Sequence, residues 1–502
     1  MAILALLNEN KAYIGDDAPK TLRKYWMLDY KNWLVGGLCS FIALGFCVNS
    51  AFSKANIIDI ASQSKNTFKS DIEGVQESML FSSYWKDKLP ARQSPILSQQ
   101  QIANQNISLL HSNKYMNDLS RFADHMDKKE AVNRIIQSSK FPDSNRYYGN
   151  GSLVTKQNFD YYKIALNIQG LKKNIKIQFG MVVRRANLRT FPTSDAVFKT
   201  PDDNNLDRFQ ETALFPAEVV AVLHQSLDQN WYYIVSYNYS GWVKKADIAI
   251  GNKQQIFQYK NEALFLIITG DKVFTTFNPY RENVSNIQLD MGTKVMLAKK
   301  DTIPTSLDGQ NTYASYVIKL PTRTDDGQLK FQLALIARNK DVHVGYLSFT
   351  RQNILNQSFK FLGERYGWGH SFNARDCTGF VGDVYKSFGI LMPRNTGQQA
   401  QSSQGQNIHF TKSTSVNEKI AGINELEAGD LIYIPGHVMM YIGMQNNQPF
   451  IIHDVSGLSY TKKNGSYYKS TLNGVSVTPL LPLQLNQETR YLDRIYNLKK
   501  IK

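Results

Sequence analysis

Short runs of β-forming residues separated by turns fill the middle of this 502-residue chain, and they constrain its fold more than any other feature. Within residues 176–255 the runs lie at 177–179, 181–183, 218–223 and 231–235, and the block ends with Gly241-Trp242-Val243. Val, Ile, Tyr and Trp, which favour strands, are frequent in these runs. Short strands at this spacing are typical of a small barrel. We therefore predict a small β-barrel over residues 176–255.

Residues 256–350 repeat this texture, with predicted strands at 264–268, 293–298, 313–318 and 333–336, and residues 344–348 mirror residues 241–243. Residues 183–189 (VRRANLR) resemble the opening of bacterial SH3-like domains, and residues 240–243 (SGWV) resemble their last strand. The resemblance implies that the first barrel is SH3-like. We predict a second, diverged SH3-like barrel over residues 256–350.

Residues 54–175 are polar, yet they carry apolar residues at helical spacing. These residues are Met116, Leu119, Phe122 and Met126, followed by Val132, Ile135 and Ile136. The spacing predicts a small, mainly helical domain. Residues 351–502 form the last predicted domain, which carries the chemistry. The predicted fold class is therefore multidomain α+β, in which a helical N-terminal domain precedes two small barrels and the C-terminal domain.

Ahead of these domains, residues 33–48 form an apolar run with basic residues before it and small and polar residues after it. This is the layout of an export signal, and the basic flank places the chain beyond residue 50 outside the cytoplasm. The run is shorter than the about 20 residues of a transmembrane helix, so a cleaved signal and an uncleaved membrane anchor at 33–52 stay open beside a buried core helix. We assign residues 1–53 to a cytoplasmic tail plus this segment. The predicted location is the cell envelope, periplasmic or otherwise extracytoplasmic.

Cys377 is the only cysteine outside the apolar run. Apolar residues recur at helical spacing from Phe380 to Phe388, and Asp376 is a suitable N-cap, so Cys377 is expected in the first turn of a buried helix. There the helix macrodipole and the free N–H groups favour the thiolate. Asp376 opposes this through its own charge, so the sequence predicts an imidazolium partner for Cys377.

Two histidines on predicted strands can supply that partner. His437 begins a predicted strand at 437–443, and His453 ends a run at 450–453. An antiparallel hairpin would bring the two strands together. His437 can then act as the base toward Cys377, and His453 can fix the orientation of its ring.

Five segments of the C-terminal domain form a larger pattern. They are residues 366–369 (YGWG), 376–380 (DCTGF), 391–396 (LMPRNT) with Gln399, 429–431 (GDL) and 437–438 (HV). In this order they resemble the NlpC-type, papain-like family of bacterial cell-wall cysteine peptidases, over about residues 355–485. Members cut peptidoglycan stem peptides, typically between γ-D-glutamate and a diamino acid such as diaminopimelate. The helical segment and the two SH3-like modules also resemble the multidomain γ-D-glutamyl-diamino acid endopeptidases.

The resemblance implies a papain-like α+β domain at 351–502 with no cofactor. It assigns Cys377 as the nucleophile that forms an acyl-enzyme, His437 as the base that protonates the leaving amine and then activates water, and His453 as the third polar residue. The substrate or partner would be stem peptides or muropeptides of peptidoglycan. A membrane would be a partner through residues 33–52 if that segment is not cleaved.

The resemblance also suggests a substrate-binding set. Asp376 would pair with the free amine of the first alanine of the stem peptide, and Tyr366, Trp368, Thr378 and Arg394 are candidates for lining the groove. Tyr366 and Trp368 also fit the role of core aromatic residues, and Arg394 that of a structural donor. Thr378 replaces a commoner serine, His370 a second glycine, and Met439 a glycine. These departures concern substrate preference and remove no catalytic group.

Other functions are weaker readings of the same residues. The formal charge of +16, from 58 Lys and Arg against 42 Asp and Glu, suits an anionic wall or membrane surface. A nucleic-acid partner is not expected, because no binding motif occurs beside the export-type segment. Cys377, His437 and His453 lack the short ligand spacing of a zinc site, so no metal is expected. The main alternative is a non-catalytic wall-binding protein that uses its SH3-like modules; a buried structural Cys377 would fit it.

Overall fold

The computed structural model describes residues 67–91 and 94–502, and residues 72–502 form one unit. The predicted export or anchor segment at 33–52 lies outside the described residues. No helix within the described part of the chain combines the length and the apolar composition needed to cross a bilayer.

Helices dominate residues 72–175. They are α4 (Ser82–Lys86), α5 (Gln99–Ser112), α6 (Lys128–Ser138) and α7 (Lys156–Ala165), joined by the strands β1 (His125–Asp127), β2 (Tyr147–Tyr148) and β3 (Asn174–Lys176). Trp85 and Ile102 are buried in the core of the C-terminal domain, whereas Ile135 and Tyr162 are buried against the first group of strands. The helices therefore share the cores of two neighbours, because so polar a segment has too few apolar side chains for a core of its own.

Residues 178–251 form a seven-stranded antiparallel sheet in the order β11-β4-β8-β9-β10-β5-β7. The strands are β4 (Gln178–Val182), β5 (Ala186–Arg189), β7 (Gln210–Leu214), β8 (Val219–Gln225), β9 (Trp231–Val235), β10 (Ser240–Lys244) and β11 (Ile248–Gly251), and the short β6 (Val197–Phe198) pairs with β2. Val220, Ile234 and Trp242 are fully buried inside it. The strands predicted at 218–223 and 231–235 are therefore present. We call this sheet the first β-unit.

Helix α8 (Lys253–Lys260) leads to a five-stranded sheet in the order β19-β18-β15-β12-β20. Its strands are β12 (Phe265–Ile268), β15 (Lys294–Leu297), β18 (Ser315–Arg323), β19 (Leu329–Ala337) and β20 (Val342–Val344), with the pairs β13 (Lys272–Phe274)–β14 (Gln288–Asp290) and β16 (Ser306–Leu307)–β17 (Gln310–Asn311) beside it. Residues 241–243, which residues 344–348 were expected to mirror, lie within β10, whereas only Val344 of the later segment lies on a strand, at the end of β20. Gly345, with a φ of 76°, still donates its N–H to the carbonyl of Phe265 on β12 at 2.9 Å.

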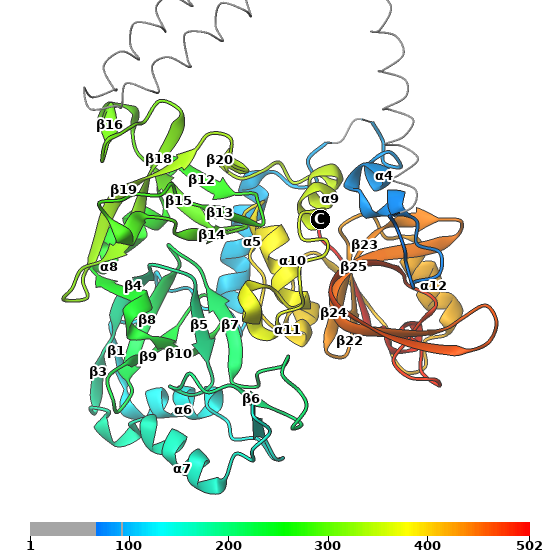
Figure 1. The fold of residues 1–502 in the computed structure, drawn as a ribbon, viewed down its shortest axis with the longest axis horizontal. Helices are drawn as coiled ribbons and strands as arrows, with labels where there is room; N and C mark the ends of the chain where they lie inside the picture. The colour runs from blue at the N-terminus through cyan, green and yellow to red at the C-terminus, as the bar shows by residue number, and fades with distance from the viewer. Residues whose placement is uncertain (1–66, 92–93) are drawn as a thin grey trace, which may run out of the picture. The chain divides into compact units, whose positions relative to one another are not determined.

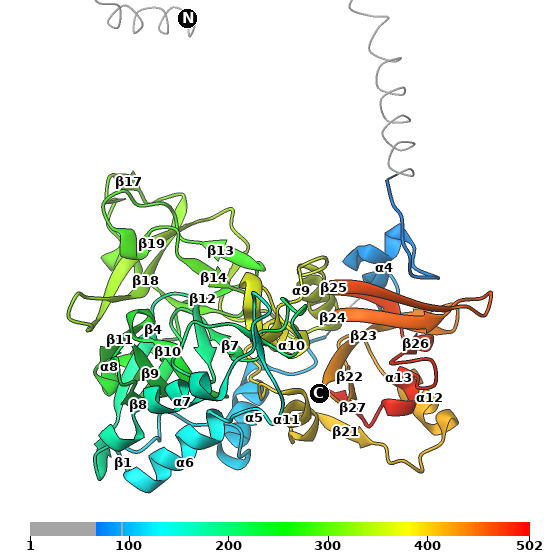
Figure 2. The same cartoon turned by 60° about the horizontal axis from the view of Figure 1, so that its bottom comes forward.

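The C-terminal domain places helices against an antiparallel sheet in the order β21-β27-β22-β23-β24-β25, in which β26 also pairs with β24. Its elements are α9 (Arg351–Phe359), α10 (Cys377–Lys386), α11 (Thr396–Gln401), β21 (Gln406–His409), α12 (Val416–Asn424), β22 (Leu431–Ile434), β23 (His437–Gln445), β24 (Gln448–Thr461), β25 (Tyr467–Pro479), β26 (Leu483–Gln484), α13 (Tyr491–Arg494) and β27 (Asn497–Lys500). Figure 1 and Figure 2 both show α10 between the two sheets of residues 178–344 and the sheet that contains β23 and β24, on which it packs.

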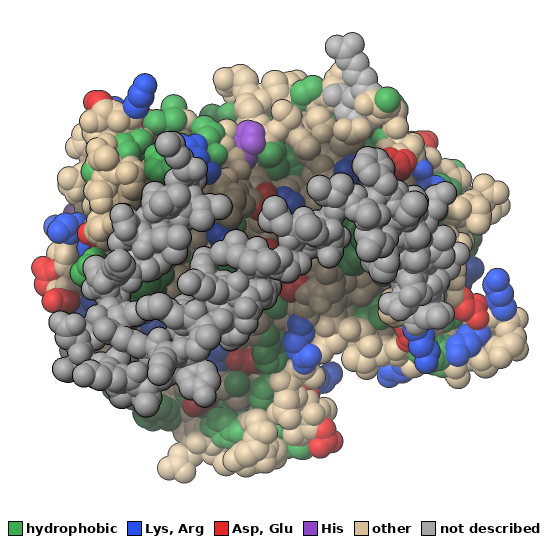
Figure 3. All heavy atoms as spheres, turned by 45° about the horizontal axis from the view of Figure 1, so that its top comes forward, with side chains coloured by type: hydrophobic (Ala, Val, Ile, Leu, Met, Phe, Trp, Pro, Cys, Tyr) green, Lys and Arg blue, Asp and Glu red, His purple; other side chains and the backbone are tan. Residues whose placement is uncertain are grey.

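The surface of the described residues carries mixed charge on the face drawn in Figure 3. Lys and Arg side chains lie at separate places there, among Asp, Glu and neutral side chains. The net positive charge of the chain is therefore not gathered into one continuous area on the visible part of this face.

Candidate active site

Cys377 is the first residue of α10, as its helical spacing predicts. The side chain of Asp376 caps this helix, since its Oδ1 accepts the N–H of Gly379 at 2.9 Å. The thiol is only 6% exposed and lies against the backbone N–H of Val438. Because Val438 follows His437 directly, the sulfur lies next to the first residue of β23. The structure thus places the predicted nucleophile against the residue that follows the predicted base in the chain.

The imidazole of His437 belongs to a relay of three side chains from three adjacent strand positions. Its Nε2 lies 2.9 Å from Nδ1 of His453 on β24, and Nε2 of His453 lies 3.0 Å from Oγ1 of Thr478 on β25. His453 and Thr478 are fully buried and His437 is half-buried, so the inner part of the relay is shielded from water. The relay uses Nε2 of His437 and leaves Nδ1 as the ring nitrogen that can accept a proton from the thiol.

The resting site favours uncharged side chains. Burial, and next the charge of Asp376, raises the pKa of the Cys377 thiol to about 12, and burial lowers the pKa of His437 to about 4. Burial also holds the pKa of His453 well below its ordinary value. These directions favour a neutral thiol and a neutral imidazole, not the standing ion pair that the helix terminus suggested. Desolvation outweighs the macrodipole here, because the thiol is enclosed.

Asp376, Thr378 and Arg394 form one buried cluster behind the thiol. The Arg394 guanidinium donates to both carboxylate oxygens of Asp376, at 3.1 and 2.7 Å, and Thr378 Oγ1 donates to Oδ1 at 2.9 Å. Nε of Arg394 donates to Thr212 Oγ1 on β7 at 2.7 Å. Burial alone would raise the pKa of Asp376, but Arg394 and the N–H donors lower it below its ordinary value. The cluster fixes the start of α10 against the first β-unit.

The two predicted groove aromatics have different neighbours. Tyr366 is 9% exposed and lies near the thiol; burial, and then the charges of Cys377 and Asp376, raises its pKa. Trp368 is half-buried, and the guanidinium of Arg208 lies 4.5 Å from the centre of its ring. Of the two side chains, Tyr366 is thus the one that the structure places near the start of α10.

The segment between Trp368 and Asn373 is held by β7. Gln210 donates from Nε2 to the carbonyl of Gly369 at 2.8 Å, and a Cβ on Gly369 would lie 2.7 Å from the Gln210 carbonyl oxygen. Gly369 also has a φ of 56°, so this position requires glycine. The following His370 adopts a φ of 65° as well, in spite of its side chain. Its buried ring packs on Phe215, which helps to hold this backbone conformation.

Four residues of the site were missed in the sequence. Thr478 ends the histidine relay. Burial raises the pKa values of Tyr433 and Tyr491, and the charge of Cys377 is a smaller cause for both, so both rings lie near the thiol. Asp454 follows His453, is fully buried, and has no hydrogen-bond partner for either carboxylate oxygen. The alternation of strand side chains around His453 could have indicated Thr478, but nothing local marks the two tyrosines.

No group of three His, Cys, Asp or Glu side chains that could hold a metal ion occurs in the described ranges, residues 67–91 and 94–502. Beside Cys377, Asp376, Thr378 and Arg394 are paired with one another through hydrogen bonds, as are His437, His453 and Thr478. The arrangement therefore offers nucleophilic and acid–base chemistry from its own side chains.

The buried histidines predict an acid-sensitive fold. Burial lowers the pKa values of His370 and His453 well below 6.5, and that of His437 to about 4. The unfolded chain takes up these protons below about pH 6.5, whereas the folded protein does not. Stability is thus complete above about pH 6.5 and lost as the pH falls toward 4, by about 1.4 kcal/mol per pH unit for each of His370 and His453.

Urea unfolding at about pH 7 and about pH 5 measures this loss. The variant His343→Gln, which changes an exposed histidine on β20, should keep the same difference between the two pH values. Equal free energies of unfolding at the two pH values would contradict the neutral buried state of these rings.

Comparison with known proteins gives two matches within this fold. Residues 363–477 match the NlpC/P60 family, and residues 196–244 match the SH3 domain of SH3b1 type. The first match contains Cys377, His437 and His453, and the second lies within the first β-unit. The multidomain α+β fold class is thereby confirmed, while closed barrels and the exact boundaries stay predictions. The helices of residues 72–175, predicted as a domain of their own, share the cores of their neighbours.

Curated relatives are similar over parts of the chain. The Gamma-D-glutamyl-L-lysine dipeptidyl-peptidase of Bacillus cereus is 26% identical over 217 residues, which are 41% of this chain and 55% of that protein. The Probable endopeptidase p60 of Listeria seeligeri is 30% identical over 127 residues, 24% of this chain and 21% of its own. The chain thus spans about half of the first relative and about a fifth of the second.

A solved structure is similar over most of the chain. An NlpC/P60 endopeptidase of Photobacterium damselae subsp. piscicida matches this chain with a TM-score of 0.66. The match covers 87% of this chain and 99% of that chain. Its identity of 17% means that the likeness establishes a shared fold. The arrangement of helices, β-units and C-terminal domain therefore occurs in a second protein.

Proposed function

From the premise that this chain carries an NlpC/P60 domain preceded by an SH3 domain of the SH3b1 type, we propose that it is a cysteine endopeptidase of peptidoglycan. The bond proposed is the one between γ-D-glutamate and the diamino acid of a stem peptide. One observation carries the proposal: Cys377 begins α10 against the N–H of Val438, and the ring of His437, the residue before Val438, is bonded to His453 at 2.9 Å. The names of the relatives, which include a γ-D-glutamyl-L-lysine dipeptidyl-peptidase, support the choice of bond.

The chemistry starts from the neutral pair. Nδ1 of His437 takes the proton of the thiol as Sγ of Cys377 attacks the amide carbonyl, so the thiolate exists only as the new C–S bond forms. A backbone N–H near Cys377 stabilises the oxyanion of the tetrahedral intermediate. The protonated His437 gives its proton to the leaving amine as the C–N bond breaks. Water, activated by His437, then hydrolyses the thioester and restores the thiol.

The relay explains why His453 matters to this sequence of steps. Its Nδ1 accepts a hydrogen bond from His437 Nε2–H in the tautomer that leaves Nδ1 of His437 free as the base. Thr478 in turn fixes His453, at 3.0 Å. His453 is therefore a positioning residue that keeps the catalytic ring in the required orientation.

The candidate substrate-binding residues divide into two roles. Asp376, Thr378 and Arg394 use their polar atoms within one buried cluster, which supports a positioning role for them at the start of α10. Tyr366 and Trp368 lie outside the cluster and are the better candidates for contact with the peptide. To pair with a substrate amine, the Asp376 carboxylate would have to give up part of its hydrogen bonding with Arg394.

The proposal includes an extracytoplasmic location, because the substrate lies in the wall and residues 33–52 have the layout of an export segment. The alternative is a wall-binding protein without catalysis that uses its SH3-like modules. Intact Cys377, His437 and His453 favour the enzyme over this alternative.

Digestion of defined muropeptides tests the function. The full chain is incubated with purified muropeptides, and the fragments are weighed by mass spectrometry. The expected products are two fragments that together contain one added water and that separate the γ-D-glutamyl group from the diamino acid. Binding of the muropeptides without any new fragment would favour the wall-binding alternative. A cut at another amide would retain the enzyme and refute the proposed bond.

A further inference from the structure

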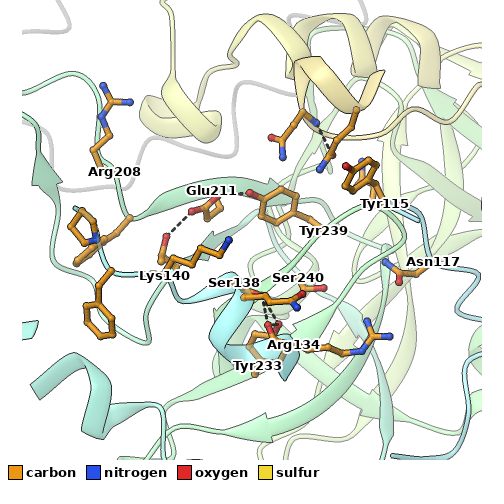
Figure 4. Close-up of a pocket in the computed structure, with 18 of the residues that line it drawn as sticks. Tyr115, Asn117, Arg134, Ser138, Lys140, Arg208, Glu211, Tyr233, Tyr239 and Ser240 are labelled. Atoms are coloured by element: carbon orange, nitrogen blue, oxygen red, sulfur yellow. Dashed lines mark hydrogen bonds between the residues drawn. The ribbon is translucent and has the colours of Figure 1, made fainter. Parts of the chain in front are cut away.

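A cavity of about 800 Å³ opens between α6, the strands β7, β9 and β10, and α11. Figure 4 shows its walls, with Arg134 and Ser138 from α6, Glu211 from β7, and Tyr239 and Ser240 at the start of β10. Neither the sequence motifs nor the proposed reaction assigns a role to this space. Its volume is ample for several residues of a peptide.

The charge of the cavity is strongly positive. Its lining contains one acidic residue, Glu211, and five basic residues, namely Lys114, Arg134, Lys140, Arg146 and Arg208. Arg134 is paired with Glu130 at 3.1 Å, and Glu211 accepts hydrogen bonds from Thr190 and Tyr239. Among the described residues, no carboxylate lies within ion-pair distance of the other four basic side chains. Their charge is therefore available to a ligand.

Two of these cations lie near enough for the charge of one to act on the other. Burial, followed by the charge of Arg208, lowers the pKa of Arg146, while the charge of Asp143 opposes the effect. Arg208 is fixed by its stack on Trp368, at 4.5 Å from the ring centre, and Arg146 by its hydrogen bonds to the loop at Ser144. Two like charges held in this way repel each other. An anion bound between them would offset this repulsion.

The cavity borders the active site at two places. Asn395 and Gln398 form part of its wall, and the preceding Arg394 binds Asp376 directly. On the other side, Arg208 stacks on Trp368, and the neighbouring Gly369 donates its N–H to Asp376 at 3.0 Å. The wall of the basic cavity is thus linked on both sides to Asp376, the residue that directly precedes Cys377.

We propose that this cavity binds the free carboxylate groups of the peptide substrate. The inference rests on the proposed function, because a γ-glutamyl link leaves the α-carboxyl of glutamate free, and diaminopimelate carries carboxyl groups of its own. The planar guanidinium of Arg208 can bind a carboxylate with two hydrogen bonds, and Arg146 and Lys140 add charge around it. The cavity would thus select acidic stem peptides over amidated ones.

Binding to a catalytically inert protein separates this inference from the proposed function. The probes are the peptide L-Ala-γ-D-Glu-diaminopimelate and the same peptide with its carboxyl groups converted to carboxamides. Titration calorimetry with the Cys377→Ala variant is expected to give a Kd about tenfold lower for the acidic peptide. Adding Arg208→Gln and Lys140→Gln should abolish that difference. The preference should also shrink as salt is raised, because the carboxylates meet the cations through partly solvated contacts.

Lys340→Gln, which removes an exposed positive charge on the turn after β19, is the matched control and should keep the preference. Arg208→Lys retains the charge without the planar fork, and an intermediate preference is expected. Equal Kd values for the two peptides, or no binding of either, would overturn the carboxylate site. Failure of the wild-type chain to cleave muropeptides would instead refute the proposed function and leave the measured preference standing.

Discussion

The variant Cys377→Ala is expected to lower the rate of stem-peptide hydrolysis by about 10³-fold or more, because no other side chain of the site can form the acyl-enzyme. Cys377 lies at the first position of α10 against Val438, where removal of the sulfur leaves the cap by Asp376 and the histidine relay intact. The fold should therefore survive the change. The measurement is the initial rate of fragment release from muropeptides, followed by mass spectrometry.

The control for this variant is Ser387→Ala at the C-terminal end of the same helix. Ser387 is also fully buried, and its hydroxyl donates only to the carbonyl of Val384, at 2.6 Å, within the described residues. Its replacement shortens a buried side chain of α10 without touching the relay, so the rate should stay within about threefold of wild type. Equal rates for Cys377→Ala and the wild type, in protein freed of contaminating hydrolases, would exclude Cys377 as the nucleophile.

Local patterns in the sequence predicted the elements that carry the site. The helix that begins at Cys377 was predicted from the apolar spacing and from a cap residue, both of which are local properties. The structure contains this helix as α10, with Asp376 as its N-cap. The hairpin that joins His437 to His453 follows in the same way, from two β-runs separated by a turn. Short-range rules of this kind predict which residues begin and end an element.

Such short-range rules could not predict whether the Cys377 thiol is charged. A helix N-terminus favours a thiolate, but the enclosure of Cys377 depends on Tyr366, Tyr433 and Tyr491, which come from three separate segments. Burial of this kind is a property of the assembled fold, and it reverses the expected direction of the pKa shift. The division of the helices at 72–175 between two cores likewise depends on contacts that lie far apart in the sequence.

Arg375, which directly precedes the Asp376–Cys377 pair, shows the same limit most clearly. Its guanidinium is fully buried and donates to three carboxylates, Asp383 at 2.8 Å, Glu364 at 2.9 and 3.1 Å, and Asp290 at 3.1 Å. Asp290 ends β14, so the contact joins the C-terminal domain to the second group of strands. Nothing near Arg375 in the sequence distinguishes it from a surface arginine.

Replacement of Arg375 by leucine is expected to lower the free energy of unfolding by about 3–5 kcal/mol, because it removes the fully buried cation that three carboxylates share. Glu364 then keeps only Lys272, Asp290 only Arg185 and Asp383 only Lys386 as Lys or Arg ion-pair partners among the described residues. Burial alone would lower the pKa of Arg375, yet the three carboxylates raise it, so the guanidinium stays charged in the interior. Its loss should force Asp290, whose pKa burial already raises, to take up a proton. Urea unfolding of the variant and the wild type measures the difference.

The matched control is Arg490→Leu, which breaks an ion pair with Asp493 on the surface. That pair is as short, at 2.8 Å, but its side chains are 45% and 33% exposed, so its loss should cost less than about 1 kcal/mol. Arg375→Lys keeps the charge but cannot reach three carboxylates at once, and an intermediate loss is expected. A cost for Arg375→Leu as small as that of the surface control would mean that water enters and solvates the carboxylates. In that case the Asp376 cap and its hydrogen bonds to Arg394 would hold Cys377 in place. The buried Arg375, although it directly precedes Asp376 in the chain, would not be needed for this.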